Sequence, residues 1–153
     1  MISCAVLGVD PGVRGGMALV RADGSLAMMW GFQPGDERAE LVGAVANAVE
    51  CLKAYRSVAC FMEQTGYMPT DGGQGAFTFG RVNGLLEGAL RALGVAPRFV
   101  APMAWQASME CLTGGNKNIS KARAKALFPA EKITHGVADA LLIAEYGRRR
   151  LAL

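Results

Sequence analysis

The 153-residue sequence lacks several features that would place it in a special class. No apolar run approaches the ~20 residues that span a membrane, and no charged segment precedes an apolar stretch at the N-terminus. Low-complexity tracts and internal repeats are also missing. We therefore expect a cytoplasmic protein with no membrane partner, folded as one domain over residues 1–153.

The four cysteines show no CxxC spacing, and three of them lie inside apolar runs. This pattern argues against a structural zinc site and favours free thiols in a reducing compartment. The cysteines are Cys4, Cys51, Cys60 and Cys111.

Charge is modest in amount and uneven in distribution. The formal net charge is +3, which decides little by itself. Residues 112–128, however, carry Lys117, Lys121, Arg123 and Lys125 with no acid among them, and residues 148–150 are three arginines. Such clusters suit a polyanion such as nucleic acid, although a solvated basic face has the same composition.

Hydrophobic periodicity predicts an α/β fold. Strands are expected over residues 4–10, 15–22, 25–32, 57–63 and 96–101, with a hairpin turn at Asp23-Gly24 joining the second and third. Helices are expected over 41–52, 80–93, 119–128 and 136–150, with a short one after Pro102 and a glycine-rich loop over 66–75. Three strands in succession, followed by strand-helix alternation, predict a five-stranded mixed sheet covered by helices.

Three carboxylates stand out by their position. Asp10 ends the first predicted strand, Glu63 ends the fourth, and Asp139 interrupts an apolar stretch of the last helix, four residues after His135. Oxygen ligands with one imidazole suit Mg²⁺ or Mn²⁺ better than structural zinc. Two such ions could hold the attacking and leaving oxygens of a phosphodiester.

Each of these residues has a simpler interpretation. Asp10 could only shape the turn at Pro11-Gly12, Glu63 could be a surface acid, and His135 could serve the start of the last helix. Asp139 is harder to explain in this way, because a lone acid among apolar neighbours is costly unless it is paired or bound to metal. A shared metal site explains all four residues together.

Four motifs resemble those of the RuvC-type Holliday junction resolvases, most closely the compact versions of phages and prophages. They are GVDPG (8–12), the pair Glu63-Gln64, FGRVNG (79–84) and HGVADALLIAEYG (135–147). The resemblance implies a ribonuclease H-like fold, a homodimer, and cleavage of symmetric strands of a four-way DNA junction. It also implies two Mg²⁺ ions, which Mn²⁺ would replace, and the bacterial host cytoplasm if a phage encodes the protein.

The resemblance also implies roles for individual residues. Asp10, Glu63 and Asp139 match the family's metal ligands, and His135 falls where members carry an acid or a histidine, as a ligand or a proton relay. Lys117 resembles the family's basic residue at the scissile phosphate, with Lys121 as a near competitor. Many compact members have lysine after the tryptophan, where this chain has Gln106.

DNA contacts are expected at two further places. Tyr67 and Met68 begin the glycine-rich loop and could stack on or wedge between bases, although a plain surface loop would look the same. Lys117, Lys121, Arg123 and Lys125 are expected to contact backbone phosphates. The surface of the 80–93 helix is either a dimer contact or ordinary core packing.

Other functions share parts of this pattern. A ribonuclease H acting on RNA–DNA hybrid would use the same fold and metals, with a glutamate on the first helix facing the site. A nuclease for other branched DNA and a non-catalytic junction-binding protein are further alternatives.

Overall fold

The computed structural model describes residues 4–32, 39–66, 70 and 72–153. In chain order the elements are β1 (Ala5–Asp10), β2 (Gly16–Arg21), β3 (Leu26–Gly31), α1 (Ala39–Leu52), β4 (Val58–Glu63), α2 (Gly73–Ala92), β5 (Pro97–Val100), α3 (Pro102–Ser108), α4 (Lys117–Leu127) and α5 (His135–Arg150). Within those described ranges, none of the helices combines the length and the apolar character that a membrane crossing requires.

The strands form one mixed sheet in the order β3-β2-β1-β4-β5. β2 runs antiparallel to both β1 and β3, whereas β4 runs parallel to both β1 and β5. Val9 lies opposite Met62, so the carboxyl ends of β1 and β4 meet at the same edge of the sheet. The predicted five-stranded mixed sheet is therefore confirmed.

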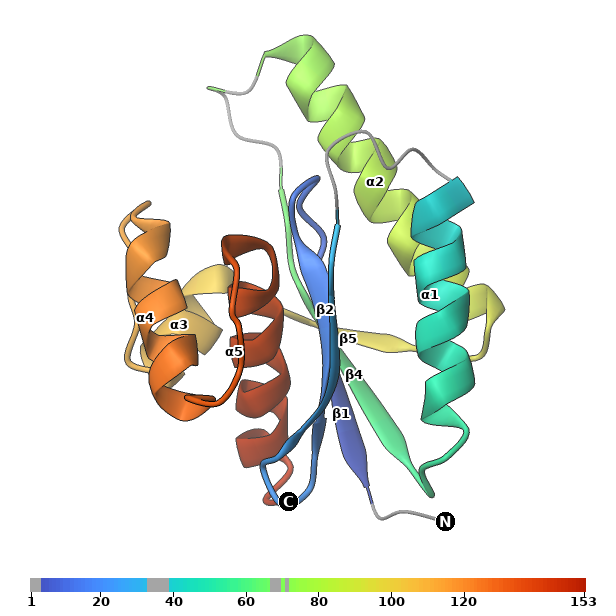
Figure 1. Ribbon diagram of the computed structural model, residues 1–153. Helices are drawn as coiled ribbons and strands as arrows, with labels where there is room; N and C mark the ends of the chain where they lie inside the picture. Colours follow the sequence, from blue (N-terminus) through green and yellow to red (C-terminus); the bar gives the residue numbers. More distant parts are fainter. Residues whose placement is uncertain (1–3, 33–38, 67–69, 71) are drawn as a thin grey trace.

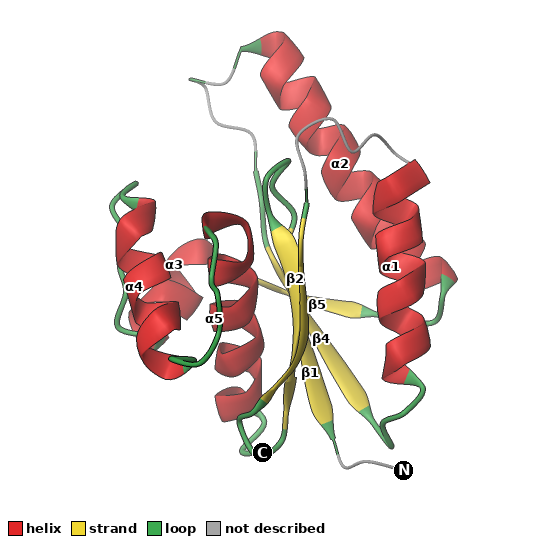
Figure 2. Cartoon of the chain, in the orientation of Figure 1, coloured by secondary structure: helices red, strands yellow, loops and turns green. Residues whose placement is uncertain are grey.

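Helices cover both faces of the sheet. Figures 1 and 2 show α1 and α2 on one side, and α5 with α3 and α4 on the other. Each face has its own core: Leu7 and Val9 of β1 pack toward α1 and α2, while Val6 packs toward α5. β1 alternates between the two cores, which explains why all six of its residues are buried.

Glycines bring α5 unusually close to the sheet. A side chain at Gly8 of β1 would collide with the α5 backbone, coming to 2.9 Å from Ala144 Cα and closer still to Ala140 O. Near the other end of the helix, a Cβ on Gly16 would lie 2.7 Å from Gly136 O. The absence of side chains at these positions lets α5 lie directly on β1 and β2.

The predicted elements match the structure closely, with one clear error. Residues 66–75 were expected to form a loop and the following helix to begin at residue 80, but α2 already begins at Gly73. The Ala76 amide donates to Gly72 O at 2.9 Å, which extends the helix into the glycine-rich segment. Glycine has a poor intrinsic helix propensity, so no local pattern predicts this extra length of the helix.

We predict that Gly8→Ala severely destabilises the protein, because the added methyl group would meet the α5 backbone rather than a flexible side chain. The expected loss in the free energy of unfolding is about 3 kcal/mol or more. Gly43→Ala in α1 is the control, since a Cβ there meets nothing within 4 Å and should slightly stabilise the helix. Urea denaturation of both variants measures the difference, and equal stabilities would contradict this account of the packing.

Candidate functional site

Asp10 lies at the carboxyl end of β1, where the chain turns sharply back into β2. The Gly12 amide donates to Asp10 Oδ1 at 3.0 Å, and the Gly15 amide donates to Gly12 O at 2.8 Å. The predicted turn role of Asp10 is thus real, but it uses one carboxylate oxygen only. The residue is 6% exposed, which is a costly position for a charge.

Glu63 ends β4, the strand parallel to β1, and a tryptophan orients its carboxylate. Trp105 of α3 is fully buried, and its indole Nε1 donates to Glu63 Oε2 at 2.7 Å. Sequence analysis did not predict this contact, because it joins residues 42 positions apart and no local pattern marks it. Gln106, the position at which the chain departs from many compact resolvases, instead accepts a hydrogen bond from the Thr113 amide at 3.2 Å.

Asp139 reaches the same region from the first turns of α5. Its Oδ1 is buried and has no hydrogen-bond partner in the described part of the chain. Lys117, the first residue of α4, places its Nζ 3.9 Å from Asp139 Oδ2. The Asn116 side chain fixes the start of α4 by accepting from the Asn118 amide at 3.1 Å.

The electrostatics of the site show that the three carboxylates lie close enough to repel one another. Burial and the negative charge of Asp139 raise the pKa of Asp10 to about 6. Burial and the negative charge of Asp10 raise the pKa of Glu63 to about 7, although the Trp105 hydrogen bond and Lys117 oppose the shift. The cluster is thus short of positive charge.

These residues fit divalent cations in their chemistry. Carboxylate oxygens are the ligands that Mg²⁺ and Mn²⁺ prefer, and Asp139 Oδ1 is a buried acceptor to which none of the described residues donates. The cage is not preformed, however: in the described ranges, no group of three or more His, Cys, Asp or Glu side chains is arranged to hold an ion. Mutual repulsion among the carboxylates favours such an open arrangement.

His135 lies at the edge of this cluster. It is the first residue of α5 and is exposed, whereas Asp139 one turn later is buried. Together with Lys117, His135 lines a cavity beside the carboxylates. The structure therefore brings Asp10, Glu63, Asp139 and Lys117 into one group and leaves His135 next to it.

The predicted DNA-binding residues occupy different surroundings. Lys125 is exposed on α4 and Lys121 is half-buried. Arg123 is engaged within the protein, because it donates to Met109 O at 2.8 Å and pairs with Glu110 at 2.7 Å. Tyr67 and Met68 lie outside the described residues.

Two of the three C-terminal arginines also serve the structure itself. Arg148 and Arg149 both pair with the buried Glu145 of α5, at 2.7 and 2.8 Å. These hydrogen bonds and charges hold the pKa of Glu145 below its usual range despite the burial. The arginine run is therefore partly an internal counter-charge for one buried acid.

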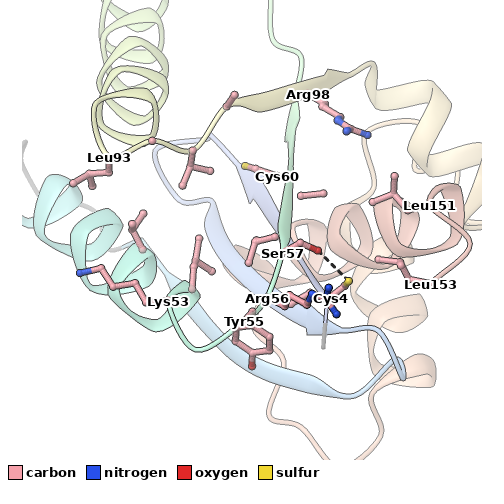
Figure 3. A pocket seen from close by; sticks show the side chains of 18 residues that line it. Cys4, Lys53, Tyr55, Arg56, Ser57, Cys60, Leu93, Arg98, Leu151 and Leu153 are labelled. Atoms are coloured by element: carbon pink, nitrogen blue, oxygen red, sulfur yellow. Dashed lines mark hydrogen bonds between the residues drawn. The ribbon is translucent and has the colours of Figure 1, made fainter. Parts of the chain in front are cut away.

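The described residues also line two other cavities, one away from the carboxylates and one beside Glu63. One, of about 780 Å³, lies around the amino ends of β1 and β4, with Lys53, Arg56 and Arg98 among its lining residues (Figure 3). It contains none of the predicted site residues. The other, of about 520 Å³, borders Glu63 and is lined by apolar groups such as Val13, Phe79 and Pro102.

The strand order β3-β2-β1-β4-β5, with helices on both faces of the mixed sheet, is that of a ribonuclease H-like fold. Solved structures agree. RuvC of Thermus thermophilus in complex with a Holliday junction substrate has 22% sequence identity and a TM-score of 0.66, covering 96% of each chain. A second structure of RuvC from Thermus thermophilus has 23% identity and a TM-score of 0.66, covering 97% of this chain and 96% of that one.

The yeast mitochondrial Holliday junction resolvase is also similar, with 11% identity and a TM-score of 0.60, over 96% of this chain and 80% of that one. No protein-family model and no curated protein matches the sequence. The likeness to RuvC-type resolvases that the motifs indicate is therefore confirmed at the level of the fold.

We predict that Asp10→Asn raises the melting temperature of the metal-free protein at pH 8. The raised pKa of Asp10 means that the folded state binds its proton more tightly than the unfolded state. The stability gained from protonation of Asp10 in the folded state is therefore fully present below about pH 4. It is lost as the pH rises through about 6. Asparagine removes the cost of the buried charge, so a rise of about 3 °C or more is expected at pH 8, and a smaller one at pH 5.

Asp23→Asn is the matched control, with the opposite sign. Hydrogen bonds from Ser25 lower the pKa of Asp23, so its ionised form stabilises the folded state and its replacement should lower the melting temperature at pH 8. Calorimetry in EDTA checks both variants. A lower melting temperature for Asp10→Asn at pH 8 would show that the ionised Asp10 does not destabilise the folded protein.

Proposed function

We propose that the protein is a metal-dependent endonuclease that resolves four-way DNA junctions by hydrolysis of symmetric strands. The observation that carries the proposal is the convergence of Asp10, Glu63 and Asp139 with Lys117 at one edge of a RuvC-like sheet. Structures of this fold include one in complex with a Holliday junction. The four motifs and the basic α4 support the same substrate.

The three carboxylates are the proposed cation ligands, with Mg²⁺ as the natural ion in two positions and Mn²⁺ as a replacement. When bound, such ions supply an activated water as nucleophile and stabilise the departing 3′ oxygen. Asp10 is held by its turn and Glu63 by Trp105, so both ligands are oriented before an ion arrives. The unpartnered Oδ1 of Asp139 gives the third point of attachment.

Lys117 is the proposed contact to the scissile phosphate. Its side chain is 65% exposed and only 3.9 Å from Asp139, so it can turn from the carboxylate to a phosphate oxygen. A cation there offsets the charge that builds on the phosphate in the transition state. His135, beside Lys117 in the same cavity, either joins the cation ligands or relays a proton.

DNA outside the centre of the junction would meet the basic α4. Lys121 and Lys125 are the proposed backbone contacts there, and Arg123 contributes to the local potential while it pairs with Glu110. Tyr67 and Met68 remain proposed as stacking or wedging residues. Contacts to phosphates position the DNA without reading its sequence, so affinity should fall steeply with salt.

The same proposal includes a homodimer formed through α2. Only Leu86 and Leu90 of this helix are buried, and Phe77 is 68% exposed. Gly80, Gly84 and Gly88 repeat at four-residue spacing, and a Cβ on any of them meets nothing within 4 Å. An exposed helix face of this kind permits close approach of a second copy.

The proposed location is the cytoplasm. The free cysteines are consistent with its reducing conditions.

A ribonuclease H that cuts RNA–DNA hybrid is the second candidate. It would be expected to direct a glutamate of the first helix at the carboxylates. Glu50 of α1 instead pairs with Lys53 on an exposed surface, with both side chains more than two-thirds exposed. Glu50 is therefore not such a glutamate, and the side chain of Glu40, the other glutamate of α1, lies outside the described part of the structure. A non-catalytic junction-binding protein and a nuclease for other branched DNA are outcomes of the same test.

We predict paired symmetric nicks in a mobile four-way junction when the purified protein is incubated with Mg²⁺ or Mn²⁺, and none in EDTA. Labelled linear duplex and RNA–DNA hybrid are the comparison substrates. Asp10→Asn should abolish cutting, because a proposed cation ligand is lost. Lys117→Gln should slow it by roughly 100-fold, because the transition-state charge is less well stabilised.

Each of the other outcomes leads to a different conclusion. Preferential cutting of the hybrid would keep the cation site and overturn the substrate. Tight junction binding without cutting would make the protein a binding module. Arg98→Gln is the control, because Arg98 lines a separate cavity that includes none of the three carboxylates, and this variant should cut as the unaltered protein does.

For the dimer, we predict that Gly84→Gln weakens self-association at least tenfold, because a long side chain would separate the two copies of α2. The fold of one protomer should be unaffected, since the position is open. Ala126→Gln, on the exposed side of α4, is the matched control. Sedimentation equilibrium measures both, and a monomeric unaltered protein would contradict the proposed dimer.

A further inference from the structure

The cavity beside the carboxylates has a composition that the proposed catalytic roles do not explain. It measures about 750 Å³, and its polar lining consists of Arg14, Lys117, Asn118, Thr134 and His135. Every one of these side chains can donate a hydrogen bond, and none of the described residues that line the cavity is an acid. Such a surface is complementary to an anion.

The walls of this cavity are held together by backbone contacts. A Cβ on Gly136 would lie 2.8 Å from Arg14 O, so the turn before β2 and the start of α5 touch directly. Gly16 meets Gly136 O in the same way from β2. Arg14 and His135 are therefore positioned on segments that cannot shift relative to each other without loss of this packing.

The cavity adjoins the carboxylate cluster at two points. Lys117 lines the cavity and also lies 3.9 Å from Asp139 Oδ2. Arg14 belongs to the same turn as Asp10, the turn closed by the hydrogen bonds of Gly12 and Gly15. A nucleic acid strand whose scissile phosphate lies at the carboxylates would thus bring a neighbouring phosphate to the cavity.

We propose that this cavity binds a second, non-scissile phosphate of the cleaved strand, with Arg14 as its principal anchor. The proposal rests on the proposed nuclease function and adds a residue to it that no motif identified. A planar guanidinium can hold two phosphate oxygens at once, which fixes the direction of the strand as well as its position. Among the described residues, Arg14 takes part in no ion pair, and its side chain is exposed.

The functional consequence is that the position of the DNA strand along the site is fixed. The carboxylate cluster alone would accept any phosphate that reaches it. A second fixed phosphate beside it defines which bond lies over the cation ligands. Arg14 is accordingly a positioning residue, and its loss should affect DNA affinity and the choice of bond more than the chemistry.

The test uses the full chain with Asp10→Asn added throughout, so that the DNA stays intact in Mg²⁺. Binding of a four-way junction is measured by fluorescence anisotropy over a range of salt concentrations for proteins with Arg14, Arg14→Gln or Arg14→Lys. A series of junctions carries a single neutral methylphosphonate, each at a different position near the cleavage point. Arg98→Gln is the control, and melting temperatures verify that every variant is folded.

Arg14→Gln should bind roughly tenfold more weakly and should lower the slope of log affinity against log salt by about 1, whereas Arg14→Lys should retain the slope. At one position of the series, the methylphosphonate should weaken binding by the protein with Arg14. The same methylphosphonate should have no effect on binding by the Arg14→Gln protein. That coupling assigns the phosphate to Arg14. Unchanged affinity of Arg14→Gln, or equal sensitivity of both proteins to every methylphosphonate, would overturn the proposal.

The outcomes for the two proposals can be separated. Binding that is no tighter to the junction than to duplex would contradict the junction substrate, while the coupling would still support the phosphate site. Symmetric cutting by the unaltered protein, with no coupling at Arg14, would contradict the phosphate site alone. Absence of DNA binding would contradict both.

Discussion

The close contact between α5 and the sheet is the constraint on which the site depends. Gly8 and Gly16 let the helix backbone approach β1 and β2 without intervening side chains. Asp139 can therefore reach the carboxyl end of β1 while its neighbours on α5 remain in the core. A layer of ordinary side chains between them would move the acid away from Asp10 and Glu63. The position of the carboxylate cluster thus depends on backbone packing as much as on the acids themselves.

Burial in this molecule has opposite effects on different acids. Asp10 is buried and Glu63 half-buried without enough positive charge nearby, and their pKa values rise. Glu145, also buried, is matched by Arg148 and Arg149, and its pKa falls. The protein clearly has arginines with which to neutralise an acid. The carboxylates at the sheet edge have too little positive charge around them. This shortage is consistent with the proposed binding of cations there.

Most of the fold and the main acids followed from the sequence because they depend on local patterns. Short apolar runs bounded by turn residues predicted the strands, and the strand ends marked Asp10 and Glu63. The early start of α2 was missed because glycine carries little local signal. The contact between Trp105 and Glu63 and the cavity around Arg14 were missed because they join distant segments. Such juxtapositions arise only from the way the layers pack.

The ion pair between Lys117 and Asp139 gives the site a counter-ion of its own. A divalent cation that binds Asp139 must compete with a tethered ammonium group rather than with water alone. For the proposed cation site, the affinity would therefore be that of an exchange reaction, lower than the ligand set would give without the lysine. The same exchange would release the Lys117 ammonium group from Asp139 when the cation binds. In the proposed nuclease, ion binding and release of the Lys117 side chain would thus be one coupled equilibrium.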